Sequence, residues 1–283
     1  MAIDDYALTT LHNAKDHLKV TDSTDDNIIE RMIDAASGAI ETYCGHKFLS
    51  QSYSEWYDGD GKSELFLNQY PVTDVTRVSV GIEDTVAVSN SSTDATRATV
   101  AVTSTGVTLV IIGGASAGTD TITFAAATTM TALETAIVAL GKGWSASVQA
   151  DFGTIVSTEL REQGARGCLG VQVSLQMAEP DSLTDYDVDW SLGILRSWSG
   201  WASGARNILV EYTAGSATVP YDIEQACLAL VGVFYNRTKH DPALKSEKLG
   251  DYAYEMAVGG QSADMPDYIK STLNRHKLHG GWA

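Results

Sequence analysis

Residues 210–226, VEYTAGSATVPYDIEQA, contain the end of a predicted strand and the start of a predicted helix. Val210 and Tyr212 alternate with polar residues as in a strand, and Gly215 supplies a turn. Pro220 then opens the helix, because proline is tolerated at the first helical position. A glycine turn before a helix is also where phosphate-binding enzymes hold their ligand. The segment between Tyr212 and Pro220 contains no cation and no metal ligand, so we interpret it as a hinge between two structural elements.

The helix after this hinge carries an apolar stripe, and so does a helix predicted over residues 26–44, which ends at Gly45. A further helix is predicted over residues 266–277. Each buried Ile or Met contributes about 1.5–3 kcal/mol, so stripes this apolar need partners. We therefore expect the helices at 26–44, 220–236 and 266–277 to pack together as a small bundle. The two strongest stripes consist of Ile28, Ile29, Met32, Ile33, Ala36, Ile40, Tyr43 and Cys44, and of Ile223, Ala226, Cys227, Leu230, Val231 and Phe234.

Strand patterns occur between the first long helix and the inserted composition at residue 83, and again before the hinge. Residues 54–67, SEWYDGDGKSELFL, predict a β-hairpin whose two strands meet at an Asp-Gly turn. Residues 71–80 predict another strand, and Pro71 favours an edge position because proline cannot donate to a sheet. Two further strands are predicted within residues 186–214. The polar residues 238–264 predict a loop with one helical turn.

Between residues 83 and 185 the composition shifts toward Ala, Thr, Ser, Val and Gly. Short strand candidates fill this segment. One helix is predicted over residues 131–140, with Thr131 and Glu134 spaced as a capping box. We interpret residues 83–185, called the inserted segment below, as a domain placed within the main one.

The predicted fold class is therefore α+β. It comprises a small helical bundle with projecting β-strands, plus an inserted β-rich α+β domain. The predicted division is 1–82 for the first part of the core, with helices and the β-hairpin, 83–185 for the insertion, and 186–283 for the second part of the core, with strands, helices and a C-terminal tail.

The composition excludes several classes of function. The chain has 283 residues, with 36 Asp and Glu against 19 Lys and Arg, and a formal charge of −17. Sequence-specific nucleic-acid binding is disfavoured, because such affinity comes largely from cations that displace counterions. The sequence predicts no membrane span and no secretion signal. Its three cysteines form no close-spaced pair, which favours buried thiols in a reducing compartment.

No motif predicts a catalytic, cofactor or metal site. The glycine-rich residues 113–120 lack the Gly-Lys-Ser/Thr of a phosphate-binding loop. Residues 58–64, DGDGKSE, begin like a calcium loop but lack the glycine and glutamate that such a loop requires. His276 and His279 could share a helix face, but no further ligand follows them. Cys168 paired with a distant histidine is compatible with a nucleophile, but ordinary packing of the thiol is favoured, and no G-x-S-x-G motif marks a nucleophilic serine.

Five segments, in order along the chain, resemble the head–tail connector proteins of tailed bacteriophages, also called adaptor or head-completion proteins. Together they cover about residues 5–82 and 185–278; the inserted segment stands where that family has a short connection. The resembling segments are AKDHLKVTDSTDDNIIERMIDAASGAIETYCGHKF (14–48), LFLNQYPVTDVTRVSV (65–80), YDVDWSLGILRSWSGWASGARNILVEY (186–212), NILVEYTAGSATVPYDIEQACLALVGVFYNRTKH (207–240) and LGDYAYEMAVGGQSADMPDYIKSTLNRHKL (249–278).

The resemblance implies a structural virion protein and no enzyme. Members of that family form a ring, commonly of twelve copies, beneath the portal protein in the neck of the virion. The ring extends the DNA channel and receives a stopper or tail-completion protein. Genomic DNA would pass through the lumen without sequence-specific binding, and assembly would take place in the host cytoplasm. The resemblance also implies that the last helix and the tail dock on the portal; the cationic and apolar residues available there are Arg275, Lys277, Leu278 and Trp282.

Two other functions are compatible with the sequence. One is a carbohydrate- or surface-binding virion module that acts through the inserted segment, with Trp198 and Trp201 as aromatic residues able to stack on sugars. The other is a hydrolase built from unassigned Ser, His and Asp residues.

Overall fold

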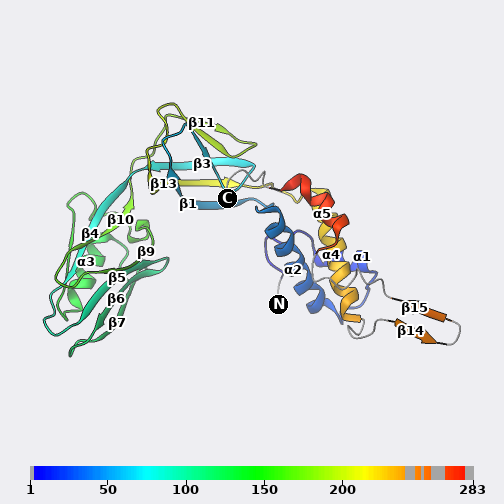
Figure 1. Cartoon of the computed structure of the whole chain (residues 1–283), viewed down its shortest axis with the longest axis horizontal. Helices are drawn as coiled ribbons and strands as arrows, with labels where there is room; N and C mark the ends of the chain where they lie inside the picture. Colours follow the sequence, from blue (N-terminus) through cyan, green and yellow to red (C-terminus); the bar gives the residue numbers. More distant parts are fainter. Residues whose placement is uncertain (1–2, 240–245, 250–251, 256–264, 278–283) are drawn as a thin grey trace.

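The computed structural model describes residues 3–239, 246–249, 252–255 and 265–277. The chain is α+β, as predicted. Helices gather at one end of an elongated molecule, two small sheets form its middle, and a β-rich region forms the other end (Figure 1).

The helical end contains the predicted bundle. Its members are α1 (Leu11–Leu18), α2 (Asp26–Cys44), α4 (Tyr221–Lys239) and α5 (Asp267–Leu273), followed by the short 3-10 helix η3 (Asn274–His276). The inward faces of α2, α4 and α5 meet in one apolar core, because their stripes recur every three to four residues. The stripe predicted for α2 supplies Ile29, Ile33, Ala36, Ile40 and Cys44 to that core.

The middle of the molecule consists of two three-stranded antiparallel sheets. One has the order β1 (Gln51–Gly59), β13 (Gly204–Ala214), β3 (Val72–Val80). The other has the order β11 (Tyr186–Asp189), β12 (Ile194–Ser197), β2 (Glu64–Phe66). Their facing side chains form a second core around Leu195, Val210 and Tyr212. Strand β3 is an edge strand, as Pro71 predicted.

The hairpin predicted over residues 54–67 is wrong. Both strands exist, but β1 pairs with β13 and β2 pairs with β12. Strand β2 has three residues, whereas β13 matches β1 along nearly its whole length and so satisfies more backbone groups. The Asp-Gly loop between the two strands is held by the segment before β13: the Gly61 N–H donates to the Trp201 carbonyl at 2.9 Å.

The β-rich region is built from two sheets around one helix. The sheets have the orders β10-β4-β8 and β7-β6-β5-β9. Their bounds are β4 Ile82–Asn90, β5 Arg97–Thr103, β6 Gly106–Ile112, β7 Gly118–Thr123, β8 Trp144–Val148, β9 Gln163–Gly167 and β10 Val173–Ala178, with α3 at Met130–Ala139 and the 3-10 turn η1 at Ser157–Glu159. The third core of the molecule lies between these sheets and α3, and all its buried members fall between residues 86 and 177.

Three local predictions fail in detail. The N-cap of α3 is Thr129, which accepts from the Ala132 N–H at 3.2 Å, whereas Thr131 donates to the Gly153 carbonyl. Strands β4 and β9 are absent from the strand candidates of the inserted segment, which are residues 97–112, 120–126, 144–150 and 170–177, because acidic residues and glycines are depleted in strands. The region predicted as a loop with a helical turn contains the antiparallel pair β14 (Ser246–Leu249) and β15 (Tyr252–Glu255).

Candidate interaction surface

A groove of about 530 Å³ lies where the helical bundle meets the sheet of β2, β11 and β12. Phe66 and Ile194 on the paired strands β2 and β12 line one wall, and η3 with the following Lys277 lines the other. The linker from α2 to β1 contributes His46 and Phe48. We call this feature the junction groove. It is mainly apolar, with Arg275 and Lys277 among its lining residues.

The hinge predicted from the sequence fixes one end of this groove. Gly215 has φ 108°, and a Cβ there would lie 2.5 Å from the Leu49 carbonyl oxygen. Its N–H donates to the Pro71 carbonyl at 2.8 Å, and Ser216 bridges to Leu49. The turn between β13 and α4 is therefore held against the start of β1, and glycine is required for that close approach.

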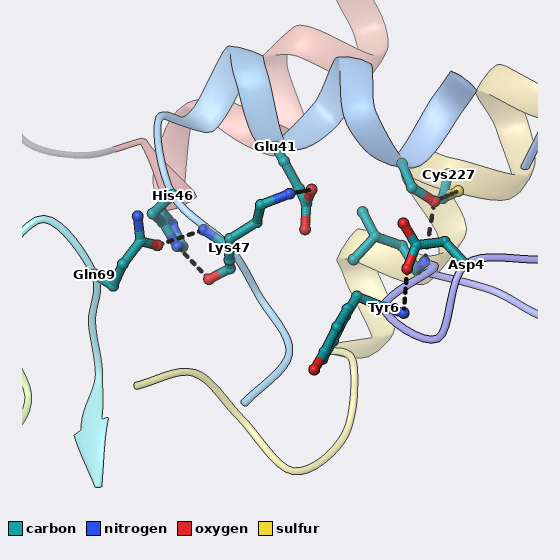
Figure 2. Close-up of polar contacts among 9 residues, drawn as sticks. Asp4, Tyr6, Glu41, His46, Lys47, Gln69 and Cys227 are labelled. Atoms are coloured by element: carbon teal, nitrogen blue, oxygen red, sulfur yellow. Dashed lines mark hydrogen bonds and ion pairs between the residues drawn. The ribbon is translucent and has the colours of Figure 1, made fainter. Parts of the chain in front are cut away.

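Lys47 fastens the linker at its other end, where α2 stops at Gly45 (Figure 2). The Lys47 N–H donates to Gln69 Oε1 at 2.8 Å, and its Nζ lies 2.5 Å from Glu41 Oε2. The Glu41 side chain is buried on the last turn of α2. A buried carboxylate needs such a partner, since burying an unpaired charge is costly.

His46 joins the linker to η3. Its Nδ1 lies 2.9 Å from the Lys47 carbonyl oxygen and its Nε2 lies 2.8 Å from the His276 carbonyl oxygen. The ring also packs against Phe48 and Tyr70. A neutral imidazole carries one N–H, so both contacts are hydrogen bonds at once only when the ring is protonated.

Asp222, on the first turn of α4, holds η3 from the opposite side. His276 Nε2 lies 2.6 Å and Arg275 Nη2 lies 3.9 Å from Asp222 Oδ2. Burial acts to raise the pKa of Asp222, but the hydrogen bond and positive charge of His276 outweigh burial and lower it. Sequence reasoning missed both His46 and Asp222, because their partners are distant in the chain.

The predicted docking residues divide into two groups. Arg275 and Lys277 lie together beyond α5; the Arg275 side chain is 73% exposed, and Lys277 Nζ lies 3.9 Å from the centre of the Tyr43 ring. Leu278 and Trp282 lie outside the residues that the structure describes.

The two tryptophans suggested for sugar stacking are not equivalent. Trp198 is 82% exposed, whereas Trp201 is 1% exposed and donates its Nε1–H to the Ser63 carbonyl at 3.1 Å. Trp201 belongs to the core of the central sheets, so it cannot stack on a ligand.

The residues considered for catalysis or metal binding have structural surroundings. Burial raises the pKa of the Cys44 and Cys168 thiols to about 11 and that of Cys227 to about 12. Such thiols are poor nucleophiles, because the thiolate is the reactive form. His276 is occupied by Asp222, and His279 lies outside the described residues. Within the described part of the chain, no group of three His, Cys, Asp or Glu side chains is placed to hold a metal ion.

A family model described as "Head completion protein" matches residues 7–148, which is half of the chain. The chain belongs to the head completion protein family. The matched part of this head completion protein begins before α1 and ends with β8, so it continues past residue 82, the predicted end of the first core segment. Membership supports a structural role in the head–tail part of a virion.

Two solved structures align with this chain over its full length. The one titled "Neck of empty GTA particle computed with C6 symmetry" has 11% identity and a TM-score of 0.44, with 100% of this chain and 96% of that chain covered. The other, "Virion of native gene transfer agent (GTA) particle", has 13% identity and a TM-score of 0.39, with 100% and 95% covered. These values are low, so the family assignment rests on the family model. No curated protein matches the head completion protein, and no helix among its described residues is long and apolar enough to span a membrane.

Proposed function

We propose that this head completion protein forms a closed ring of twelve copies beneath the portal, in the neck of the virion. The ring connects the DNA-filled head to the tail and extends the DNA channel. The observation that carries this proposal is the family match, which covers the bundle helices α1 and α2 and the first central strands. The protein acts by holding other components together, without enzymatic turnover, cofactor or metal.

The surface around the junction groove is proposed to dock on the portal. Arg275 and Lys277 would form ion pairs with acidic groups of the portal, and Leu278 and Trp282 would add apolar contacts. The groove supports this assignment because exposed Arg275 and half-buried Lys277 lie beside its apolar lining in a chain whose net charge is −17. A charged rim around an apolar centre is a common arrangement in protein interfaces.

The acidic charge also fits the proposed passage of DNA. Carboxylates that face the lumen would repel phosphates, so genomic DNA would slide through without sequence-specific binding. A stopper or tail-completion protein would bind the opposite side of the ring, and assembly would take place in the host cytoplasm before the neck is complete.

We propose that residues 83–185 form a domain of their own within a core made of residues 1–82 and 186–283. The separate apolar core of residues 86–177 supports this division. The alternative function is a carbohydrate- or surface-binding module that acts through the inserted segment. Of the two tryptophans considered for it, both outside that segment, Trp198 is exposed and Trp201 is buried.

Electron microscopy of the purified protein, alone and with its portal, tests the proposed function. We expect closed rings, and we expect rings seated on the portal when both are mixed. The double variant Arg275→Glu/Lys277→Glu should form rings that no longer bind the portal, because both proposed contacts change sign. The matched control is Arg97→Glu, an exposed arginine on β5, which should bind as the wild type does. Wild-type protein that forms no ring, or a double variant that binds the portal normally, would contradict the proposal.

A further inference from the structure

Three arginines without carboxylate partners lie close together where the β-rich region meets β1 and β13. Arg161 and Arg206 line a cavity of about 530 Å³. Arg166 is on β9, the strand that begins two residues after Arg161. We call Arg161, Arg166 and Arg206 the arginine cluster. The cavity beside the arginine cluster is separate from the junction groove, because the two have no lining residue in common.

The contacts of the cluster leave its charge unpaired. Arg161 donates from Nη1 to the Arg206 carbonyl at 3.2 Å, and its guanidinium lies 5.4 Å from the centre of the Trp56 ring. The Arg161 Nε is buried and has no hydrogen-bond partner. Arg166 donates to the Ser174 carbonyl. None of the three forms an ion pair with a carboxylate among the residues that the structure describes, whereas nearby Arg77 lies 2.7 Å from Glu159.

Two features show that the cluster is held in place. The Arg206 backbone has φ 48°, in the left-handed region, and its N–H donates to Asp58 Oδ1 at 2.5 Å. Arg161 is fixed by its contacts with Trp56 and the Arg206 carbonyl. Burial, followed by the positive charges of Arg206 and Arg166, lowers the pKa of Arg161. The cations therefore repel one another, and an anion bound between them would relieve that repulsion.

The surroundings favour a carboxylate as this anion. A guanidinium matches the planar carboxylate through two parallel hydrogen bonds. Four glutamates line the same cavity: Glu55 accepts from Tyr212, Glu159 pairs with Arg77, and Glu162 and Glu211 are the other two. They would repel the many charges of a duplex, but a single carboxylate can approach the arginines between them.

We propose that the arginine cluster binds an Asp or Glu carboxylate of a second copy of this chain. This inference rests on the ring proposed above. Copies that each carry a charge of −17 repel one another, so contacts between them need cations that are not already neutralised. A closed ring also joins two different surfaces of each copy, and the cluster supplies the cationic one.

Zero-length cross-linking tests the contact directly. Arg161→Lys places an amine in the cluster that carbodiimide can couple to a touching carboxylate. Rings assembled from equal amounts of nitrogen-15-labelled and unlabelled Arg161→Lys chains should yield mixed-label cross-links at residue 161. The matched variant Arg97→Lys should yield none. If residue 161 is joined only to its own chain, or to no carboxylate, the proposal is wrong.

Ring stability gives the second measurement. Arg161→Ala/Arg206→Ala should assemble about tenfold more weakly than the wild type, because a desolvated ion pair is lost. Arg97→Ala should differ by less than about twofold. Circular dichroism melts identify any variant that fails to fold, and for such a variant the cross-linking result decides.

The stability measurements distinguish a failure of the proposed arginine contact from a failure of the proposed ring. Rings of Arg161→Ala/Arg206→Ala as stable as the wild type would overturn the role of the cluster and leave the ring proposal standing. Wild-type protein that forms no ring would overturn both. Rings of normal stability that lose binding to a 30-base-pair duplex would identify a nucleic-acid site instead, and would also overturn the proposal.

Discussion

At the scale of single residues, Glu55 is the polar centre of the sheet formed by β1, β13 and β3. Its Oε2 accepts from the hydroxyls of Tyr57 and Tyr212, the latter at 2.6 Å, and from Asn68 Nδ2 at 3.3 Å. Burial, with these contacts to Glu55, raises the pKa of both tyrosines. The phenols therefore stay protonated and donate, which satisfies the carboxylate.

Removing one of these donors should destabilise the fold. We expect Tyr212→Phe to lower the free energy of unfolding by about 1.5–3 kcal/mol, because Glu55 loses a hydrogen bond to a charged group. Tyr53 provides the matched control: its ring stacks on Tyr212, but its buried hydroxyl has no partner among the described residues. Tyr53→Phe should be neutral or slightly stabilising in urea unfolding. Equal losses in the two variants would contradict this account of Glu55.

Asp222 predicts a dependence of stability on pH. The pKa of its carboxyl in the folded protein is below the ordinary value of 3.8. Its contribution is therefore present above pH 3.8 and is lost as the pH falls through the lower folded value. Because the Asp222 side chain is partly exposed, its contribution to the free energy of unfolding should be below about 1 kcal/mol. Between pH 7 and pH 3, Asp222→Asn should lose less unfolding free energy than the wild type. Asp267→Asn, in the exposed first turn of α5, should follow the wild type.

At the scale of elements, the turn between β13 and α4 depends on Gly215. Gly215→Ala should lower the free energy of unfolding by about 1–3 kcal/mol. The new Cβ would clash with the Leu49 carbonyl oxygen, and alanine would have to adopt a positive φ. Gly38, on the exposed face of α2, has open space around its Cα. Gly38→Ala should therefore stabilise the protein by about 0.5–1 kcal/mol, since alanine favours a helix interior. Melting temperatures that change in the same direction for both variants would argue against this role for Gly215.

Elements with strong local signals could be predicted from the sequence. Helix α2 has the predicted bounds of residues 26–44 because its stripe, its length and Gly45 all agree. Partner choice could not be predicted: the Asp-Gly loop favours a hairpin, yet β1 finds its partner in β13 about 150 residues later along the chain. The junction groove could not be predicted for the same reason, since His46 and the His276 carbonyl that it contacts are far apart in the sequence.

At the scale of the whole molecule, the inserted segment has ends that meet. The Leu183 N–H donates to the Val78 carbonyl at 2.6 Å, so a short Gly-Ser linker can join residues 82 and 186. We expect this deletion to leave a protein that unfolds cooperatively, because no buried residue in the core of the bundle or of the central sheets comes from 83–185; partly buried Leu183 is the one apolar contact that the central core loses.

Calorimetry and urea unfolding test that deletion. Arg77 loses its partner Glu159 when the segment is removed, so a second form with Arg77→Gln should be at least as stable as the simple deletion. Loss of a cooperative transition in both forms would show that the remaining parts depend on the deleted segment for folding.

The three apolar cores share no buried residue. A mutation that enlarges or shrinks a side chain in one interior therefore imposes no repacking on the other two. Natural selection can act on each interior separately: the bundle interior, beside the proposed portal-docking surface, would be held nearly constant, while the β-rich interior behind Arg161 and Arg166 is free to drift. Among related phages we expect this end of the molecule to diverge fastest.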